Sequence, residues 1–356
     1  MHAPDTYRFF DQRVRLNAPP SVRAAWNLLY GAMADPDLAP ATREHRVDVA
    51  ADGVLTVNGQ MRDPGPGSIM ARLQEVVQND ILTSVTSHLL WHGAVWRIDG
   101  RALLVVADSG CGKTTLSLRH RVCGGEVWSD EAGGWDLATG GLRAWPRAMA
   151  VRPDSLALAG MAGHPPPTLD LDERKHIVPV DAASGETSLA LAGVALLEWP
   201  VDPSHRESEG WHTAEFEVPG RDRGWINAWR VQCPSWQVLP HPDGPPWWRI
   251  RCPTPVSAGQ VAAALHGVGA RYGGWHDGPR RRPDFQQSPV MSALAGADRV
   301  SALLAHTLNG RALSMVIGEG RVWAAARLAM VDVPGCRIVP GELDATYRML
   351  VEAVRR

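Results

Sequence analysis

One stretch of the chain, residues 102 to 118, constrains the fold more than any other. It reads A-L-L-V-V-A-D-S-G-C-G-K-T-T-L-S-L, which is an apolar run, a turn with two glycines, and helix-forming residues that begin at Lys113. This is the order of strand, loop and helix that a phosphate-binding loop requires. The sequence therefore predicts an α/β fold whose first functional element is a loop for a nucleoside triphosphate.

The loop departs from the pattern G-x-x-x-x-G-K-[ST] at one position, because an alanine stands in place of the first glycine. Its two glycines still supply the permissive backbone that lets successive N–H groups face an anion. The lysine would neutralise phosphate charge and the following threonine hydroxyl would bind Mg²⁺. The alternative is a Gly-Cys-Gly turn before an ordinary core helix. The residues expected to bind ATP are Ser109, Gly110, Cys111, Gly112, Lys113, Thr114 and Thr115.

The rarity of lysine supports this interpretation of the loop. Lys113 and Lys175 are the only two lysines, although Lys and Arg together number 36. A compact ammonium on a flexible stem reaches between phosphates, whereas a planar guanidinium would meet them differently. The preference for arginine therefore stops where a phosphate site needs lysine.

Composition restricts the setting of the site. The 356 residues, 45% of them hydrophobic, suggest about two or three domains, and a net charge of -2 gives no general attraction to nucleic acid or membrane. Five cysteines without a C-x-x-C pair indicate neither a disulfide framework nor a zinc site. No signal peptide or bilayer-spanning apolar run is visible. We expect a cytoplasmic protein without nucleic-acid or membrane partners, and the sequence leaves homo-oligomerisation open.

Turn signals divide the chain into three regions. We expect an N-terminal α+β region at 1–66, a nucleotide-binding core at 67–255 and a C-terminal α+β lobe at 256–356, with the first boundary at the Pro-Gly-Pro-Gly stretch. Asp99-Gly100 is a favoured two-residue turn, so the loop should follow the second arm of a hairpin, which predicts a mixed sheet.

Periodicity predicts several elements outside the loop region. Helical spacing is expected at 21–34, from the N-cap residue Ser68 onward, and at 262–270, 299–308 and 343–354. Extended runs are expected at 126–129, 194–198, 312–317 and 322–326.

Two carboxylates, Asp130 and Glu131, follow the short apolar run Val127-Trp128. Adjacent carboxylates at a strand end repel each other unless a cation bridges them. A bound Mg²⁺ would relieve that repulsion, with one acid helping to hold the metal and the other accepting a proton from an attacking hydroxyl. The alternative is a solvated turn in the segment S-D-E-A-G-G.

His92 precedes the loop in the segment L-L-W-H-G-A-V. A histidine among apolar residues is typically a hydrogen-bonded structural residue. The order of His-Gly, hairpin, Ser-Gly-x-Gly-Lys loop and a strand ending in two acids nevertheless resembles the HPr kinase/phosphorylase family, whose fold is shared with phosphoenolpyruvate carboxykinases. The separations from His92 to Lys113 and from Lys113 to Asp130 match those of that family, and the resemblance covers residues 88–150.

The resemblance implies an α/β P-loop kinase core with a mixed sheet and a site for ATP and Mg²⁺. It implies that Asp130 is the catalytic acid/base toward a seryl hydroxyl, that His92 neighbours Asp130, and that Lys113 stabilises the transferred charge. At the position of Glu131 the family has a metal-associated aspartate, whose side chain is one methylene shorter than that of glutamate. The implied metal ligands are therefore Thr114, Asp130 and Glu131.

The chain lacks the family's L-E-x-R-G-L-G-type segment, which is tied to work on HPr, so HPr is not the expected substrate. The remainder resembles shorter, divergent HPr-kinase-like proteins of bacteria, through Pro146-Arg147, the segment 173–179 and an apolar strand that ends at Glu198. By this resemblance Arg174 and Lys175 would approach the nucleotide phosphates or the phosphorylated product. The alternative is a charge cluster on the surface.

Some members of that divergent group phosphorylate a hydroxyl of ribosomally made peptide precursors, including lasso peptides. Beyond residues 88–150, which carry the resemblance, the chain has many tryptophans, among them Trp199, and an arginine triplet at 280–282. These residues suit peptide docking, and the alternative is that the tryptophans pack in the hydrophobic core and the triplet lies in a solvated loop. The expected function is ATP- and Mg²⁺-dependent phosphoryl transfer to a Ser/Thr hydroxyl of a peptide or protein, with a lasso-peptide precursor as the candidate. The alternatives are a small-molecule kinase and a nucleotide-switched binding module without transfer.

Overall fold

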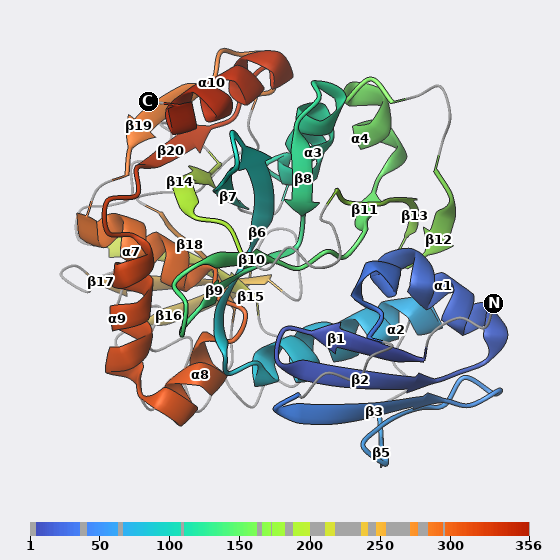
Figure 1. Ribbon diagram of the computed structural model, residues 1–356. Helices are drawn as coiled ribbons and strands as arrows, with labels where there is room; N and C mark the ends of the chain where they lie inside the picture. The colour runs from blue at the N-terminus through green and yellow to red at the C-terminus, as the bar shows by residue number, and fades with distance from the viewer. Residues whose placement is uncertain are drawn as a thin grey trace.

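The structure is a computed structural model with α-helices and mixed β-sheets (Figure 1). Several expectations fall outside the residues that it describes, namely Ser109, the boundaries at the Pro-Gly-Pro-Gly stretch and at 255–256, the helix at 262–270 and the arginine triplet at 280–282. The described residues are 5–35, 41–62, 67–107, 110–161, 166–171, 173–181, 188–199, 211–217, 236–240, 247–253, 271–276, 284–294 and 296–355.

A mixed sheet of eight strands forms the centre of the molecule. Its strands are β6 (His88–Ile98), β7 (Arg101–Ala107), β8 (Glu126–Ser129), β9 (Ala132–Asp136), β10 (Leu142–Ala144), β14 (Leu191–Leu197), β19 (Val290–Ala293) and β20 (Gly335–Val339). Their order is β10-β9-β6-β7-β14-β20-β19, with β8 also beside β6. Strands β7, β14 and β20 run parallel, and the other pairs are antiparallel. The carboxyl ends of β7 and β14 therefore lie at one edge, where open α/β sheets bind their ligands.

The hairpin predicted before the loop is confirmed. Strands β6 and β7 pair in antiparallel register, with Ile98 opposite Arg101. Asp99 and Gly100 have φ angles of 50° and 77°. Positive φ at both central residues is the geometry of a type I′ turn, whose twist matches that of the strands. The segment expected to bind phosphate therefore follows the end of β7 opposite this turn.

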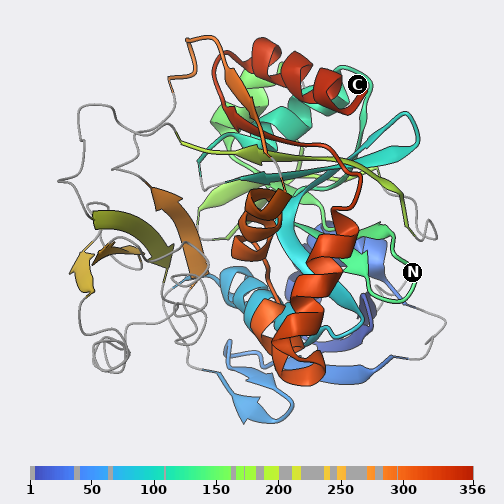
Figure 2. The same cartoon turned by 90° about the vertical axis from the view of Figure 1, so that its left-hand side faces the viewer.

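Helices cover both faces of the central sheet (Figures 1 and 2). Alternate residues of β7 point to opposite faces, as a strand period of two requires. Leu104 and Val106 pack in the core formed with α7 (Gly296–Ala305), α8 (Gly310–Ile317) and α9 (Glu319–Ala329). Leu103 and Val105 pack in the core formed with α3 (Lys113–Val122) and α10 (Leu343–Arg355). Full burial of such a side chain contributes about 1.5–3 kcal/mol.

The strands expected at 312–317 and 322–326 are wrong, because both segments lie in helices, α8 and α9. Val322, Ala326 and Ala329 recur at intervals of four and three and are all buried, which is the helical pattern. A short apolar run that fits either period cannot be assigned by periodicity alone.

A second, five-stranded sheet belongs to the N-terminal region. It contains β1 (Thr6–Phe9), β2 (Gln12–Asn17), β3 (Arg43–Val49), β4 (Leu55–Val57) and β5 (Gln60–Met61). Helices α1 (Pro20–Tyr30) and α2 (Ile69–Val76) contribute to the same hydrophobic core. The expected N-cap of α2 is confirmed, since the Ser68 hydroxyl accepts a hydrogen bond from the Ala71 backbone N–H at 3.1 Å. The chain continues through a π-helix, Val77–Ile81, and a 3-10 turn, Leu82–Ser84.

Two smaller sheets complete the described structure. One has the order β11 (Met149–Val151), β13 (Arg174–Val178), β12 (Thr168–Asp170), and it lies near α4 (Pro153–Leu158) in Figure 1. The other has the order β16 (Gln237–Pro240), β17 (Trp247–Pro253), β15 (Trp211–Glu217), β18 (Arg271–His276). Among the described helices, none is long and apolar enough to cross a bilayer.

Candidate functional site

The loop and the start of α3 have the backbone geometry expected of an anion site. Gly110 and Gly112 have φ angles of 80° and 86°, which a residue with a side chain adopts only at a cost. Gly112 precedes the first residue of the helix, Lys113. The helix start adds free N–H groups and the positive end of the helix dipole to this turn.

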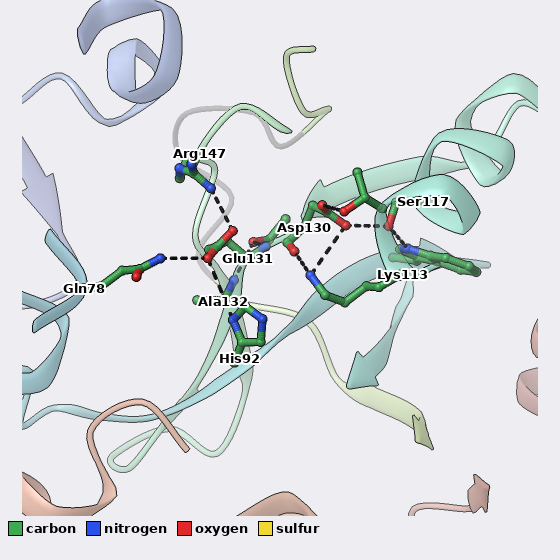
Figure 3. A network of polar contacts seen from close by, with 11 residues as sticks. Gln78, His92, Lys113, Ser117, Asp130, Glu131, Ala132 and Arg147 are labelled. Atoms are coloured by element: carbon green, nitrogen blue, oxygen red, sulfur yellow. Dashed lines mark hydrogen bonds and ion pairs between the residues drawn. The ribbon is translucent and has the colours of Figure 1, made fainter. Parts of the chain in front are cut away.

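Asp130 is the carboxylate at which the side chains of α3 converge (Figure 3). Its Oδ2 accepts a hydrogen bond from the Thr114 hydroxyl at 2.6 Å, and its Oδ1 accepts one from Ser117 at 2.9 Å. The ammonium of Lys113 donates to the Asp130 carbonyl oxygen and lies 3.8 Å from Oδ1. Only 8% of the Asp130 side chain is exposed, so these three groups compensate a carboxylate that has lost most of its water.

A line of side chains behind Asp130 fixes Ser117 in place. The indole N–H of Trp96 donates to the Ser117 hydroxyl at 3.0 Å, and the Trp96 ring stacks on His120 at 4.7 Å between centroids. Ser117 was not among the residues predicted for the site. Its position four residues after Lys113 on the same helix is the signal that could have found it.

Glu131 has entirely different neighbours, although it is the next residue (Figure 3). Its Oε2 pairs with the Arg147 guanidinium at 2.8 Å, and its Oε1 accepts a hydrogen bond from the Gln78 amide at 3.0 Å. The His92 ring nitrogen Nδ1 lies 3.8 Å from the same Oε1. Both carboxylate oxygens are therefore engaged with nitrogen groups.

The cations around Glu131 determine its ionisation. Burial alone would raise the pKa of this carboxyl, but the surrounding charges outweigh burial and lower the pKa to about 2. In order of effect, the neighbours responsible are Arg147, His92, Lys113 and Lys175. Glu131 is therefore a stable anion in the working range of pH.

Two elements that pack in the core of the five-stranded sheet reach this part of the site. Gln78 comes from the π-helix that follows α2, and π-helical turns frequently mark functional sites. The Arg147 guanidinium lies over the Tyr30 ring of α1, 5.9 Å from its centroid, and only 6% of the Arg147 side chain is exposed. Gln78 was not predicted as a site residue, because nothing in the local sequence of a helix shows which distant residue a polar side chain will contact.

His92 is brought to the site but not to the neighbour that the resemblance implies. Its ring forms the contact with Glu131 described above, whereas Asp130 is the expected neighbour. Its backbone N–H donates to the His306 carbonyl at 2.7 Å, which ties β6 to the segment between α7 and α8. With 39% of its side chain exposed, His92 is more open than Lys113 and Arg147, at 12% and 6%.

The remaining predicted residues divide between the site and its periphery. Lys175, 3.7 Å from Glu173, is close enough for its charge to act on Glu131. Arg174, the preceding residue of β13, instead bonds the Thr168 hydroxyl on the neighbouring strand, because successive strand residues face opposite ways. Thr115 donates to Ser155 of α4 at 3.1 Å, and Cys111 is fully buried in the core beside α3.

The donor set fits Mg²⁺ at one of the two acids. No group of three or more His, Cys, Asp or Glu side chains in the described part of the chain could hold a metal by itself. Mg²⁺ is usually held by one or two protein oxygens together with phosphates and water. Thr114 and Asp130 can supply the protein oxygens. Glu131 is a poor ligand, because its oxygens are paired with a guanidinium and an amide.

Comparison with known proteins does not supply a family for this arrangement. No protein-family model matches the chain, and no curated protein matches it.

Proposed function

We propose that this protein is an ATP- and Mg²⁺-dependent kinase that transfers the γ-phosphoryl group to a Ser or Thr hydroxyl of a peptide or protein. One observation carries the proposal. The first two residues of α3, Lys113 and Thr114, both contact Asp130 at the end of β8. A phosphate loop, a lysine, a threonine hydroxyl and an acid in contact are the parts that phosphoryl transfer requires.

Each side chain has a role that its surroundings support. Lys113 and the loop N–H groups would bind the β- and γ-phosphates, while Thr114 and Asp130 would hold Mg²⁺. Mg²⁺ bound there would supply neutralisation of the charge that builds on the phosphoryl oxygens. Glu131 with Arg147 forms a buried ion pair that stabilises the end of the strand bearing Asp130.

The transfer step is an in-line displacement on the γ-phosphorus. The acceptor hydroxyl oxygen forms the new O–P bond, the bond to the β,γ-bridging oxygen breaks, and ADP leaves with that electron pair. The hydroxyl proton passes to a carboxylate, a role that the resemblance to HPr kinases gives to Asp130. Its hydrogen bonds from Thr114 and Ser117 hold that carboxylate in one orientation.

The acceptor class rests on the same resemblance and on the open side of the site. The partly exposed His92 marks the side of Glu131 that solvent reaches, and an acceptor chain would approach there. A peptide precursor of the lasso type remains the candidate acceptor. No membrane or nucleic-acid partner is proposed.

The test is an incubation of the protein with Mg²⁺ and γ-labelled ATP, together with Ser/Thr-containing peptides in one arm and small hydroxylated metabolites in another. Label on a peptide supports the proposal. Label only on a metabolite would make this a small-molecule kinase, and tight ATP binding without any transfer would make it a nucleotide-switched binding module.

Lys113→Met is the variant that links the activity to this site, and Arg355→Met is its control. Arg355 is an exposed residue of α10 that pairs with Asp99, in the turn at the opposite end of β7 from the loop. We expect transfer to be lost in Lys113→Met and unchanged in Arg355→Met.

A further inference from the structure

The indole of Trp199 lies against the phosphate-binding loop. Trp199 follows β14 by two residues, and Leu197 of β14 is paired with Ala107, the last residue of β7. A methyl group built on Gly110 would lie 3.2 Å from Cζ2, 3.9 Å from Cε2 and 4.0 Å from Nε1 of Trp199. These three atoms lie on the side of the indole that carries the nitrogen, so the nitrogen lies close to Gly110.

The indole N–H of Trp199 is a buried hydrogen-bond donor that has no acceptor among the described residues. Leaving such a donor unpaired costs about 1–3 kcal/mol, and most buried polar groups in native proteins are paired. An unpaired donor next to a functional loop therefore points to an acceptor that the loop binds.

The backbone holds Trp199 in this position. The preceding residue, Glu198, donates its N–H to the Ile338 carbonyl at 3.0 Å and pairs with Arg337 at 2.8 Å. Both partners lie in β20, the next parallel strand of the sheet. The backbone that carries the indole is therefore fixed at the carboxyl edge shared by β7, β14 and β20.

We propose that the Trp199 indole N–H is a phosphate-binding donor, which contributes a hydrogen bond to a phosphoryl oxygen of the nucleotide held by the loop. This inference rests on the proposed function in so far as the ligand of the loop is a triphosphate. Gly110 and Gly112 give the loop backbone N–H groups that face an anion, and the indole adds a side-chain donor beside them. Tryptophan donates and never accepts, so its partner must be an acceptor such as a phosphate oxygen.

The unpaired donor favours phosphate over the other ligands of a tryptophan. Stacking on a nucleobase, or packing against an acceptor peptide, would use the face of the ring and leave the N–H without an acceptor. The nitrogen is buried and is among the indole atoms nearest Gly110. This position supports a role for Trp199 at the nucleotide in place of the peptide-docking role that the sequence also allows.

The experiment is a calorimetric comparison of ATP and inorganic tripolyphosphate binding to the wild type and to Trp199→Phe, which keeps a ring but removes the donor. Trp26→Phe is the matched control, because Trp26 also has a buried Nε1 without a described partner but lies in the N-terminal core. We expect Trp199→Phe to bind both ligands roughly ten- to a hundredfold more weakly, as loss of a hydrogen bond to a charged group predicts, and Trp26→Phe to bind them like the wild type.

Other outcomes overturn the inference. Weaker binding of ATP alone would show that the ring stacks on the base, and unchanged binding of both ligands with weaker peptide acceptance would assign the ring to the acceptor. If Trp199→Phe does not fold, the wild type labelled at the indole nitrogens keeps the test open, because one N–H signal must shift when tripolyphosphate is added. A wild type that binds tripolyphosphate and ATP but transfers no phosphate would defeat the kinase proposal and leave this inference standing.

Discussion

At the scale of single residues, the site separates two adjacent acids into different environments. Asp130 accepts hydrogen bonds from two hydroxyls of the loop helix, whereas Glu131 is paired with Arg147 and bonded by Gln78. Like charges on neighbouring residues are tolerated because each carboxylate has its own compensating partners. These surroundings tie Glu131 to the protein framework and leave Asp130 as the acid of the proposed nucleotide site.

Asp130→Asn should keep ATP binding within about tenfold while transfer falls roughly a hundred- to ten-thousandfold, the usual contribution of a general base. The amide keeps the shape of the side chain but cannot take a proton. Nucleotide titration and single-turnover transfer measured on the same preparation check this. Full transfer by Asp130→Asn, or a larger loss in Glu131→Gln with ATP binding intact, would move the proton-accepting role to Glu131.

Glu131 should also make stability depend on pH. Its pKa is about 2 in the folded protein and about 4.5 without these contacts, so its stabilising effect is complete above about pH 4.5 and is lost as the pH falls toward 2. Urea unfolding of the wild type and of Glu131→Gln measures it. The difference between their unfolding free energies should be constant near neutral pH and should shrink below about pH 4.5. A difference that stays constant down to pH 2.5 would contradict the lowered pKa.

At the scale of elements, close contact between β6 and β7 places His92 beside the acids. A methyl group on Gly93 would lie 2.9 Å from the backbone carbonyl oxygen of Val105, so no side chain fits between these strands without moving one of them. Gly100 has room for a side chain, because a methyl group there would meet nothing within 4 Å. Its φ of 77° is nevertheless strained for any residue with a side chain.

Gly93→Ala should therefore reduce both stability and transfer, because the strand that carries His92 must shift. Gly100→Ala is the control, and it should cost about 1–2 kcal/mol of stability from the left-handed backbone while leaving the KM for ATP unchanged. Thermal unfolding and steady-state kinetics of both variants check this. Equal kinetics for the two variants would show that the β6–β7 contact does not position the site.

The elements that the sequence predicts well are those with local signals. The strand that ends at Ala107, the helix that begins at Lys113, the Asp99-Gly100 turn and the Ser68 cap each depend on neighbours in the chain, and the described residues show all four. Helices α8 and α9 differ from the expected strands because their short apolar runs fit both periods. The approach of Gln78 and Trp199 depends on how distant elements pack, which no local pattern contains.

At the scale of the whole molecule, the C-terminal helices are tied to the strand that bears His92. Asn309, which is fully buried just before α8, accepts a hydrogen bond from the Leu90 N–H at 2.9 Å. Its amide nitrogen donates to the carbonyls of Val85 and His88 at 2.8 and 2.7 Å. One side chain thus bonds three backbone groups between residues 85 and 90, where β6 begins.

Asn309→Ala should lower the free energy of unfolding by about 2–4 kcal/mol, because it leaves buried backbone groups unpaired. Asn17→Ala is the comparison, since the amide of Asn17 makes an exposed contact with Asp48 and its loss should change stability by less than about 0.5 kcal/mol. Urea unfolding of both variants gives the two values. A loss below about 1 kcal/mol in Asn309→Ala would show that stability does not depend on these three hydrogen bonds.

The central claim is that the loop, Thr114 and Asp130 together make a site for ATP with Mg²⁺. The most direct measurement is a calorimetric titration with ATP, with and without Mg²⁺, on the wild type and on Thr114→Val, which removes only the hydroxyl. We expect Mg²⁺ to strengthen ATP binding by the wild type and Thr114→Val to lose most of this gain. The site would be ruled out if the wild type does not bind ATP, or if Mg²⁺ has no effect on ATP binding by either protein.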